Sequence, residues 1–600
     1  MVSFYQAEKK SNLSKAIEVT CSALDIQGRG ICKHEGMVYF VPNLMPGEKA
    51  RIVPASANAT ANTGTLSNAA SAKASAVGVS AKASAAGAST KASAVAPKDK
   101  FAPAKVTKLL TVSPQRLTPT CPLHEQCGGC PLDHLPVEKA LDAKIKGIAQ
   151  LFTKVIVQGT KAALTPTSSK AVASSRFNSK STIKQALAHK QAQAKQKARQ
   201  QEIAKATAAA SALMQQPNFV LHGESTGYRR ACRLALRADH GKLYLGFRAA
   251  QSNELVPLTH CEVLTERNNA LLAPLTSLVN TLSCKKSIGH VELLDTDGLV
   301  GVLFRLTCHL EQVDELKLQD FAQQHQVVIS VLEPFKQLDD TEVVRERIIA
   351  TPENPLSAVA APAVSSAPAA SPDAGSEDSA ASTEDSAAGS TKNAADAGKS
   401  AAGAGKSAAS SALFVHSHDC TVYCSPSSFV QVNSAMNQAL LAQVLSEVAP
   451  HPEQKVLDLF SGLGNFALPI AKAGASVVGI DIVSDMVQRA QENAQDNGLS
   501  PEQARFYMAN LEEPFESQMW AKEHYDVVVM DPGRMGAKRA VTYMDKLQPN
   551  KIIMISCNPL AASRDCSQLL ASHYKITSWG VVDMFPRTAH VEMVLVFTRA

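Results

Sequence analysis

Two short segments carry residues that suit covalent and acid–base chemistry. Asp531-Pro532-Gly533-Arg534 and Ser556-Cys557-Asn558-Pro559 each follow an apolar run with the pattern of a buried strand. A cysteine at such a strand end is partly exposed, beside helix N-termini and an arginine, and these surroundings favour the thiolate. An isolated cysteine is usually a buried packing residue. The flanking Asn-Pro and the strand-end position favour a nucleophile here.

A glycine-containing segment indicates a nucleotide site. Residues 456–460 (VLDLF) lead into residues 461–467 (SGLGNFA), and Asp481 ends the next strand-like run. Glycines let the chain turn tightly and approach a ligand closely, and the carboxylate can accept hydrogen bonds from two ribose hydroxyls. GLGNFA also satisfies the dinucleotide pattern G-x-G-x-x-G/A. This segment alone does not separate a nicotinamide cofactor from S-adenosylmethionine.

A group of cysteines has the spacing of a metal site. Cys121, Cys127 and Cys130 form a C-x5-C-x2-C pattern, with two glycines that ease a tight wrap round a metal centre. An ordinary iron–sulfur cluster needs a fourth thiolate, and Cys261 is our candidate. Zinc bound by four cysteines is the alternative, because both sites use a close C-x2-C pair.

The surrounding elements predict three folded parts. Strand and helix patterns alternate over residues 413–600, which predicts a doubly wound, Rossmann-like α/β domain with ligands at the carboxyl ends of its strands. Residues 12–112 contain short strands with turn signals and predict an OB-like β-barrel, with a purely structural β module as the alternative. Residues 113–150 hold three cysteines and a helix. Together with residues 219–348, where strands and helices alternate, they predict a central α+β domain.

Three low-complexity segments interrupt these parts. Residues 55–98 contain a nine-residue Ala/Ser-rich repeat and residues 351–412 are rich in Ala, Ser, Pro and Gly, so both are expected to be disordered. Residues 160–216 are basic and predict a lone solvated helix after Thr182. Lys161 to Lys205 contains ten Lys/Arg and one acidic residue. This charge fits either a polyanionic partner or a flexible solubilising tail.

Composition sets broad limits. The 600 residues carry a formal net charge of +6 and 13 cysteines. The absence of an apolar run near 18 residues argues against a membrane span. No signal peptide is recognisable between Met1 and Lys15, so we expect a cytoplasmic protein with few or no disulfides.

Five motifs together resemble the RNA uracil-C5 methyltransferases. They are SFVQVN (428–433), VLDLFSGLGNF (456–466), DPGR (531–534), ISCNP (555–559) and DMFPRTAHVE (583–592), and they follow the family's order through the predicted α/β domain. The resemblance implies S-adenosylmethionine as methyl donor, Cys557 as the nucleophile that adds to C6 of uracil, and Glu592 as the base that removes the C5 proton. It also implies a set of cofactor-binding residues: Gln431, Phe460, Asn465, Asp481, Asn510 and Asp531. Phe429 is a weaker candidate for stacking on the extruded base.

The same resemblance bears on the cluster and the substrate. It favours a [4Fe–4S] cluster on Cys121, Cys127, Cys130 and Cys261, and it makes the N-terminal barrel a TRAM domain that binds RNA. A chain with both features resembles the members that methylate uridine 1939 of 23S ribosomal RNA, and we expect it to act as a monomer. Another ribosomal or transfer RNA uridine, or a non-catalytic RNA-binding protein on this scaffold, remains as an alternative. The chain departs from the family pattern at Ser461 and Gly533, and the latter leaves the position of Arg534 open.

Overall fold

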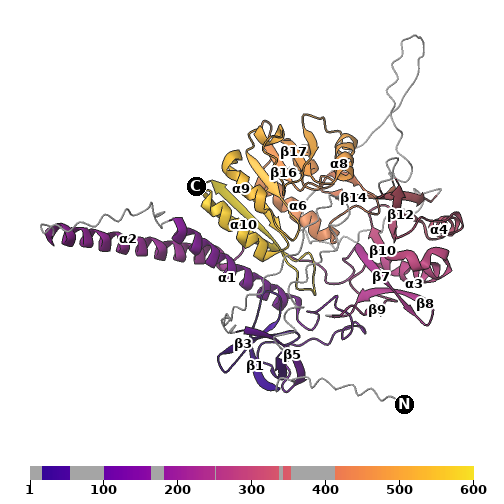
Figure 1. The fold of residues 1–600 in the computed structure, drawn as a ribbon, viewed down its shortest axis with the longest axis horizontal. Helices are drawn as coiled ribbons and strands as arrows, with labels where there is room; N and C mark the ends of the chain where they lie inside the picture. The colour runs from indigo at the N-terminus through magenta and orange to yellow at the C-terminus, as the bar shows by residue number, and fades with distance from the viewer. Residues whose placement is uncertain are drawn as a thin grey trace, which may run out of the picture.

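The computed structural model describes residues 16–54, 101–163, 182–250, 252–336, 342–352 and 412–599. The Ala/Ser-rich repeats, residues 164–181 of the basic segment and nearly all of the 351–412 segment lie outside the described residues. Figure 1 shows four described parts: an N-terminal barrel, a long helical arm, a central domain and a C-terminal domain. In the part of the chain that is described, no helix has the length and apolarity to cross a membrane.

The N-terminal part is a closed β-barrel, as the sequence predicted. Its strands follow the order β1-β2-β3-β5-β4, with the bounds β1 Ile17–Leu24, β2 Gly30–His34, β3 Met37–Val41, β4 Lys49–Pro54 and β5 Phe101–Leu109. Side chains alternate between the two faces of a strand, and the inward set, which includes Val19, Cys32, Val41 and Ile52, forms the barrel core. The closure leaves no strand edge unpaired along the barrel wall.

The central part is a mixed sheet with helices packed on it. The strand order is β13-β12-β11-β10-β7-β8-β9, with the bounds β7 Ala231–Asp239, β8 Lys242–Arg248, β9 Leu255–Pro257, β10 Ile288–Asp295, β11 Val300–Leu306, β12 Val327–Lys336 and β13 Glu342–Ala350. Helices α3 (Glu266–Thr281) and α4 (Gln312–His325) bury their apolar side chains against it. Two of its arginines form ion pairs within the domain: Arg230 with Asp297 and Arg233 with Glu292, each at 2.8 Å.

The C-terminal part is the predicted doubly wound domain. Its strand order is β18-β17-β16-β19-β20-β22-β21-β6, with the bounds β16 Lys455–Leu459, β17 Ser476–Asp481, β18 Ala504–Met508, β19 Val527–Met530, β20 Lys551–Ser556, β21 Tyr574–Val582 and β22 Glu592–Arg599. β6 (Phe219–Leu221) pairs with β21. The sequence placed residues 219–221 in the central domain, and this assignment was wrong for them because they complete the C-terminal sheet.

Two apolar layers enclose this sheet. One joins the strands to α6 (Ser434–Val448), α7 (Ala467–Lys472) and α8 (Ser484–Asp496), and the other joins them to α9 (Lys538–Leu547), α10 (Pro559–Ala571) and α1 (Val137–Ala163). Along β20, Ile553 and Ile555 enter the first layer whereas Ile552 and Met554 enter the second. Burial on both faces explains the continuous apolar runs in the sequence.

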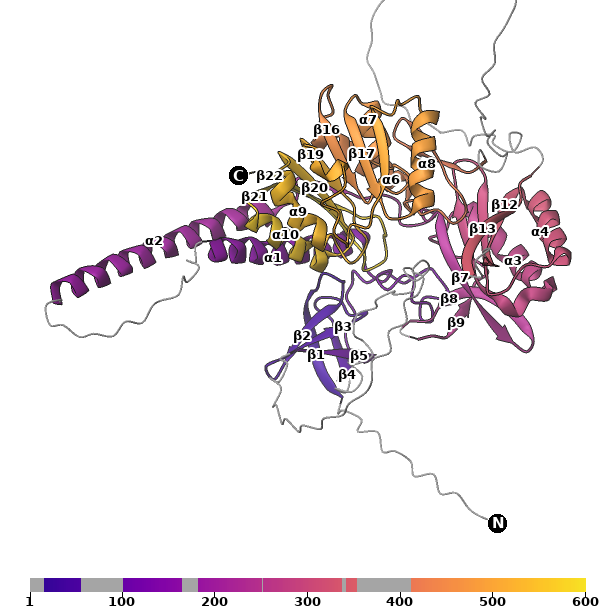
Figure 2. The same ribbon diagram turned by 45° about the horizontal axis from the view of Figure 1, so that its top comes forward.

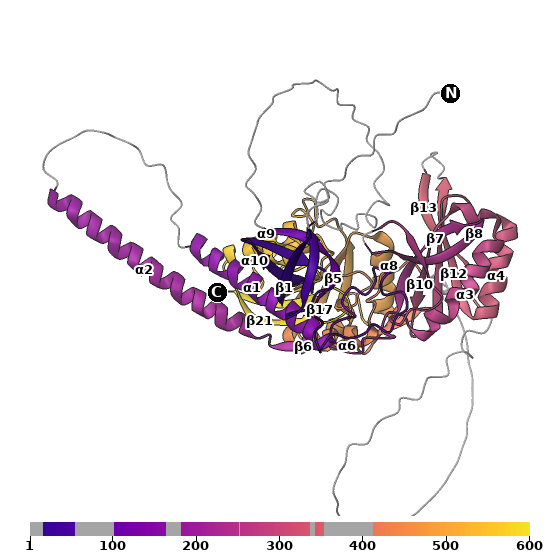
Figure 3. The same cartoon turned by 90° about the horizontal axis from the view of Figure 1, so that it is seen from below.

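The arm consists of α1 and α2 (Thr182–Gln215), which pack side by side in all three views. α2 is helical as predicted, but it is not alone. Met214 near its end is buried in the C-terminal core, and Trp579 donates its indole N–H to the Leu213 carbonyl at 3.0 Å. Figures 2 and 3 show the remainder of α2 extending away from the body of the protein.

Candidate active site

The glycine segment forms a strained loop at the carboxyl end of β16. Phe460, Gly462 and Gly464 have φ values of 67°, 53° and 92°, a region that suits glycine but is costly for phenylalanine. At Gly464 a Cβ atom would lie 2.7 Å from Cγ of Leu468. The sequence therefore requires glycine at this position to let the loop pass close to the helix that follows.

Asp481 holds this loop against the end of β17. One carboxylate oxygen accepts the Gly462 N–H and the other accepts the Val483 N–H, each at 2.9 Å. Each oxygen keeps a second lone pair, so the carboxylate can still accept the predicted hydrogen bonds from a ribose. The same contacts make Asp481 a positioning residue for the loop.

The other predicted cofactor residues differ in how free their side chains are. Gln431 donates to Asp531 at 3.3 Å, so these two lie together. The Asn510 carboxamide oxygen accepts the Glu512 N–H at 3.0 Å. The Asn465 side chain bonds with Ser417 and, in both directions, with Asn437. Asn465 therefore has little side-chain capacity left for a ligand.

Strand register brings the two predicted catalytic residues together. Ser556 at the end of β20 pairs with Met593 of the antiparallel strand β22. Because the strands run in opposite directions, Cys557, which follows Ser556, comes next to Glu592, which precedes Met593. Cys557 is half-buried and Glu592 is buried. Asn558 caps α10 by accepting the Leu560 N–H at 3.1 Å, and it donates to the Arg534 carbonyl at 2.8 Å. The cysteine loop and the loop after Asp531 are thereby fixed to each other.

The electrostatics of Cys557 contradict the expectation of a stabilised thiolate. Burial, together with the nearby carboxyl groups of Glu592 and Asp531, raises the pKa of Cys557 to about 11, against the opposing effect of Arg534. Burial also raises the pKa of Asp531, and burial and Asp531 raise that of Glu592. The thiol of the ligand-free protein is therefore expected to hold its proton at neutral pH, because burial and two acidic groups outweigh one arginine.

Sequence reasoning missed Asp458, which lies in β16 directly below the glycine loop. The residue is fully buried, and burial, followed by the charge of Asp531, raises the pKa of its carboxyl group well above the ordinary value. The available signal was an acidic residue inside the otherwise apolar run VLDLF, since such residues are rarely buried without a function or a partner.

The segment before Glu592 is anchored by three other parts of the chain. Lys144 of α1 forms a buried ion pair with Asp583 at 2.8 Å. Tyr228 donates its hydroxyl to the Pro586 carbonyl at 3.0 Å, and Arg587 pairs with Glu262 at 2.6 Å. The position of the candidate base thus depends on the arm and on the central domain.

The four predicted cluster cysteines lie near one another. In the described part of the chain Cys121, Cys127, Cys130 and Cys261 form no disulfide. Burial raises the pKa of Cys127, and so do the neighbouring thiols Cys261 and Cys121; burial and Cys261 also raise that of Cys130. No group of three or more His, Cys, Asp or Glu side chains spaced to hold a metal ion is found among the described residues. Four thiols are the donors that an ordinary iron–sulfur cluster uses, so the residue types fit such a cluster although their spacing in this structure does not.

Comparison with known proteins bears on the family of this chain. The sequence model described as tRNA (Uracil-5-)-methyltransferase matches residues 405–600. A relative from Shewanella frigidimarina, named 23S rRNA (uracil(1939)-C(5))-methyltransferase RlmD, is 30% identical over 100% of this chain and 99% of its own length. A protein of the same name from Shewanella sp. (strain MR-7) is 28% identical over the full length of both chains.

The crystal structure of Pyrococcus abyssi tRNA (uracil-54, C5)-methyltransferase, in complex with S-adenosyl-L-homocysteine, superposes with a TM-score of 0.54. The alignment covers 97% of this chain and 100% of that one at 18% sequence identity, so this likeness concerns the fold. The full-length identity to the Shewanella protein decides the family: the chain belongs to the S-adenosylmethionine-dependent RNA (uracil-C5)-methyltransferases.

Proposed function

We propose that this protein transfers the methyl group of S-adenosylmethionine to C5 of a uridine in 23S ribosomal RNA, through a covalent bond between Cys557 and C6. The observation that supports this mechanism is the β20–β22 register, which puts Cys557 beside Glu592. The choice of substrate, uridine 1939, is supported by the names of the full-length relatives. With this substrate we expect a cytoplasmic enzyme that acts as a monomer.

The chemistry follows from the weak nucleophilicity of uracil C5. Cys557 gives its proton to solvent water, and its thiolate adds to C6 so that negative charge builds up toward C5 and the carbonyl oxygen. C5 then attacks the methyl group. The bond between the methyl carbon and sulfur breaks, and the sulfonium becomes a neutral thioether. Glu592 removes the C5 proton, and the electron pair of that C–H bond re-forms the C5–C6 double bond and expels the Cys557 thiolate.

The remaining predicted residues serve binding in this proposal. Gln431, Asp481 and Asp531 line the cofactor side, with Phe460 and Asn510 on neighbouring loops, and the glycine loop supplies its backbone. Phe429, which is 67% exposed, offers a face for the extruded uracil. Cys121, Cys127, Cys130 and Cys261 would hold a [4Fe–4S] cluster, which would fix the segment between barrel and arm. The barrel and the basic arm would contact RNA phosphates.

Methyl transfer from labelled S-adenosylmethionine to unmodified 23S RNA and to transfer RNA tests this function. Cys557→Ala should abolish transfer, whereas Glu592→Gln should accumulate a protein–RNA adduct that survives denaturing electrophoresis, because the thiolate cannot leave until C5 is deprotonated. Cys308→Ala, at a half-buried cysteine of the central domain, is the matched control and should keep wild-type activity. Label in transfer RNA would overturn the substrate, and activity in Cys557→Ala would overturn the covalent mechanism.

A further inference from the structure

Two large apolar side chains project into solvent close in sequence to Asp531 and Cys557. Met535 is 79% exposed and lies four residues after Asp531, while Leu560 is 71% exposed and lies three residues after Cys557. Single exposed apolar residues are common. These two are distinctive because Met535 stands on the loop that follows Asp531 and Leu560 stands in the first turn of α10, directly after Cys557-Asn558-Pro559.

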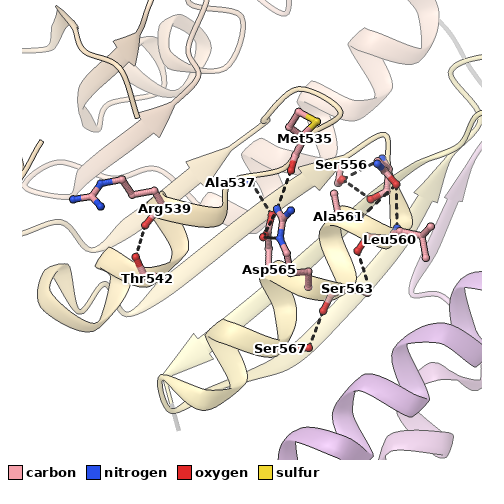
Figure 4. A network of polar contacts seen from close by, with 12 residues as sticks. Met535, Ala537, Arg539, Thr542, Ser556, Leu560, Ala561, Ser563, Asp565 and Ser567 are labelled. Atoms are coloured by element: carbon pink, nitrogen blue, oxygen red, sulfur yellow. Dashed lines mark hydrogen bonds and ion pairs between the residues drawn. The ribbon is translucent and has the colours of Figure 1, made fainter. Parts of the chain in front are cut away.

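Hydrogen bonds hold the loop that carries Met535, and Leu560 belongs to α10, so their exposure belongs to a defined conformation. Two backbone carbonyls of the loop after Asp531 accept side-chain hydrogen bonds. The Arg534 carbonyl accepts from Asn558 and the Met535 carbonyl accepts from Arg564, both at 2.8 Å. The Ala537 N–H donates to the Asp565 carboxylate at 2.7 Å. Figure 4 shows Met535 on its loop and Leu560 at the start of α10, each with hydrogen bonds to its own neighbours.

Glycine at position 536 is required by the same arrangement. Gly536 has a φ of 78°, and a Cβ atom there would lie 2.4 Å from Asp565 Oδ2 and 2.6 Å from Arg564 Nη2. The chain thus adopts a tight turn that leaves the Met535 side chain outside the core, while the hydrogen bonds fix its backbone. A loop built in this way presents the side chain to a ligand at low entropic cost.

Cationic residues lie close in sequence to both side chains. Arg534 and Lys538 are exposed, and the side chain of Arg564 is 43% exposed. Arg534 is also within electrostatic reach of the Cys557 thiol. Apolar side chains among cations beside a reacting group suit a strand of nucleic acid, whose bases are apolar on their faces and whose phosphates are anionic.

We infer that Met535 and Leu560 form an apolar wedge that packs against the RNA bases next to the target uridine and fills the space left when that uridine is extruded. The inference rests on the proposed function, because it needs RNA at Cys557. Extruding a base exposes the faces of its neighbours and costs stacking energy. Apolar side chains inserted between bases cover those faces again. The wedge would therefore select the extruded state of the RNA without touching the reacting atoms.

The test compares Met535→Ala/Leu560→Ala with wild type on a folded 23S RNA fragment that contains the target uridine. We expect kcat/KM to fall roughly ten- to hundredfold, the range that one to two lost base contacts would give. Affinity for S-adenosylmethionine, measured by calorimetry, should stay unchanged. Met519→Ala, at a side chain that is 82% exposed elsewhere on the domain, is the matched control and should match wild type.

A second substrate separates a wedge from a general defect. In a fragment with abasic sites on both sides of the target, no neighbouring bases remain to be covered, so wild type and the double variant should react at similar rates. Met535→Leu/Leu560→Met keeps the apolar volume and should keep most activity on the intact fragment. Wild-type kcat/KM in the alanine double variant, or weaker cofactor binding in it, would overturn the wedge. An inactive wild-type enzyme would overturn the proposed function and the wedge with it.

Discussion

The buried ion pair between Lys144 and Asp583 allows a quantitative test of how the arm supports the active site. The two side chains are 1% and 2% exposed and 439 residues apart, with Nζ 2.8 Å from Oδ1. At an effective dielectric constant of about 20, unit charges at this distance attract by about 6 kcal/mol, much of which offsets their desolvation. Lys144→Met leaves the Asp583 carboxylate buried without its cation. We therefore expect a loss of about 3–5 kcal/mol in the free energy of unfolding of the C-terminal domain.

The same helix offers a matched control. Lys146 pairs with Asp142 at 2.7 Å, but the side chains are 68% and 52% exposed, so Lys146→Met should cost less than about 0.5 kcal/mol. Urea unfolding followed by the fluorescence of buried Trp520 and Trp579 reports this domain. Replacing both partners, as in Lys144→Met/Asp583→Leu, should recover part of the loss, since no lone charge remains. Equal effects of Lys144→Met and Lys146→Met would refute the reasoning.

Three further outcomes follow from other parts of the structure. Burial opposes ionisation of Glu48, but its bonds with Arg116 and with backbone N–H groups prevail and lower the pKa of Glu48. Glu48→Gln should therefore cost about 2 kcal/mol at neutral pH in urea unfolding, and the difference from wild type should shrink as the pH falls through that lowered pKa, where wild type loses the same charge. Gly464→Ala should weaken S-adenosylmethionine binding at least tenfold in calorimetry, because the added Cβ collides with Leu468 and the left-handed φ disfavours alanine. In the protein without methyl donor, alkylation of Cys557 by iodoacetamide, followed by mass spectrometry of its peptide, should speed up with pH from 7 to 10, since the pKa of Cys557 is raised to about 11 and the thiolate is the reactive form; a rate independent of pH would contradict this.

Local sequence patterns were sufficient to predict the active-site loops. The glycines after β16 and the acid that ends β17 act within a few residues, so their spacing predicted a tight turn beside an acidic strand end. The barrel was predicted for the same reason, because all of its strands apart from β5 follow one another closely between Ile17 and Pro54. Whether the assigned side chains bind cofactor and RNA stays a prediction.

Contacts between distant segments could not be predicted. β6 ends at Leu221 and completes a sheet whose neighbouring strand β21 begins only at Tyr574, and no local pattern encodes that pairing. The anchors of the segment before Glu592 come from α1 and the central domain, again far away along the chain. Helix α2 has no apolar stripe along most of its length, so sequence reasoning treated it as solitary, although its end is held by Met214.

The error over Cys557 has the same origin and bears on mechanism. Only the helix N-terminus is adjacent to Cys557 in sequence, whereas Arg534 and Asp531 both follow β19 and Glu592 begins β22. Burial, which raises the pKa of Cys557 most, is a property of the folded domain and not of the local sequence. Three acidic groups in a shared low-dielectric site resist simultaneous ionisation, because each charge raises the pKa of the others. A sulfonium cation placed beside Asp531 would lower the pKa of all three groups. Binding of the methyl donor would then be the event that releases the thiol proton, so the nucleophile would form only when a methyl group is present to be transferred.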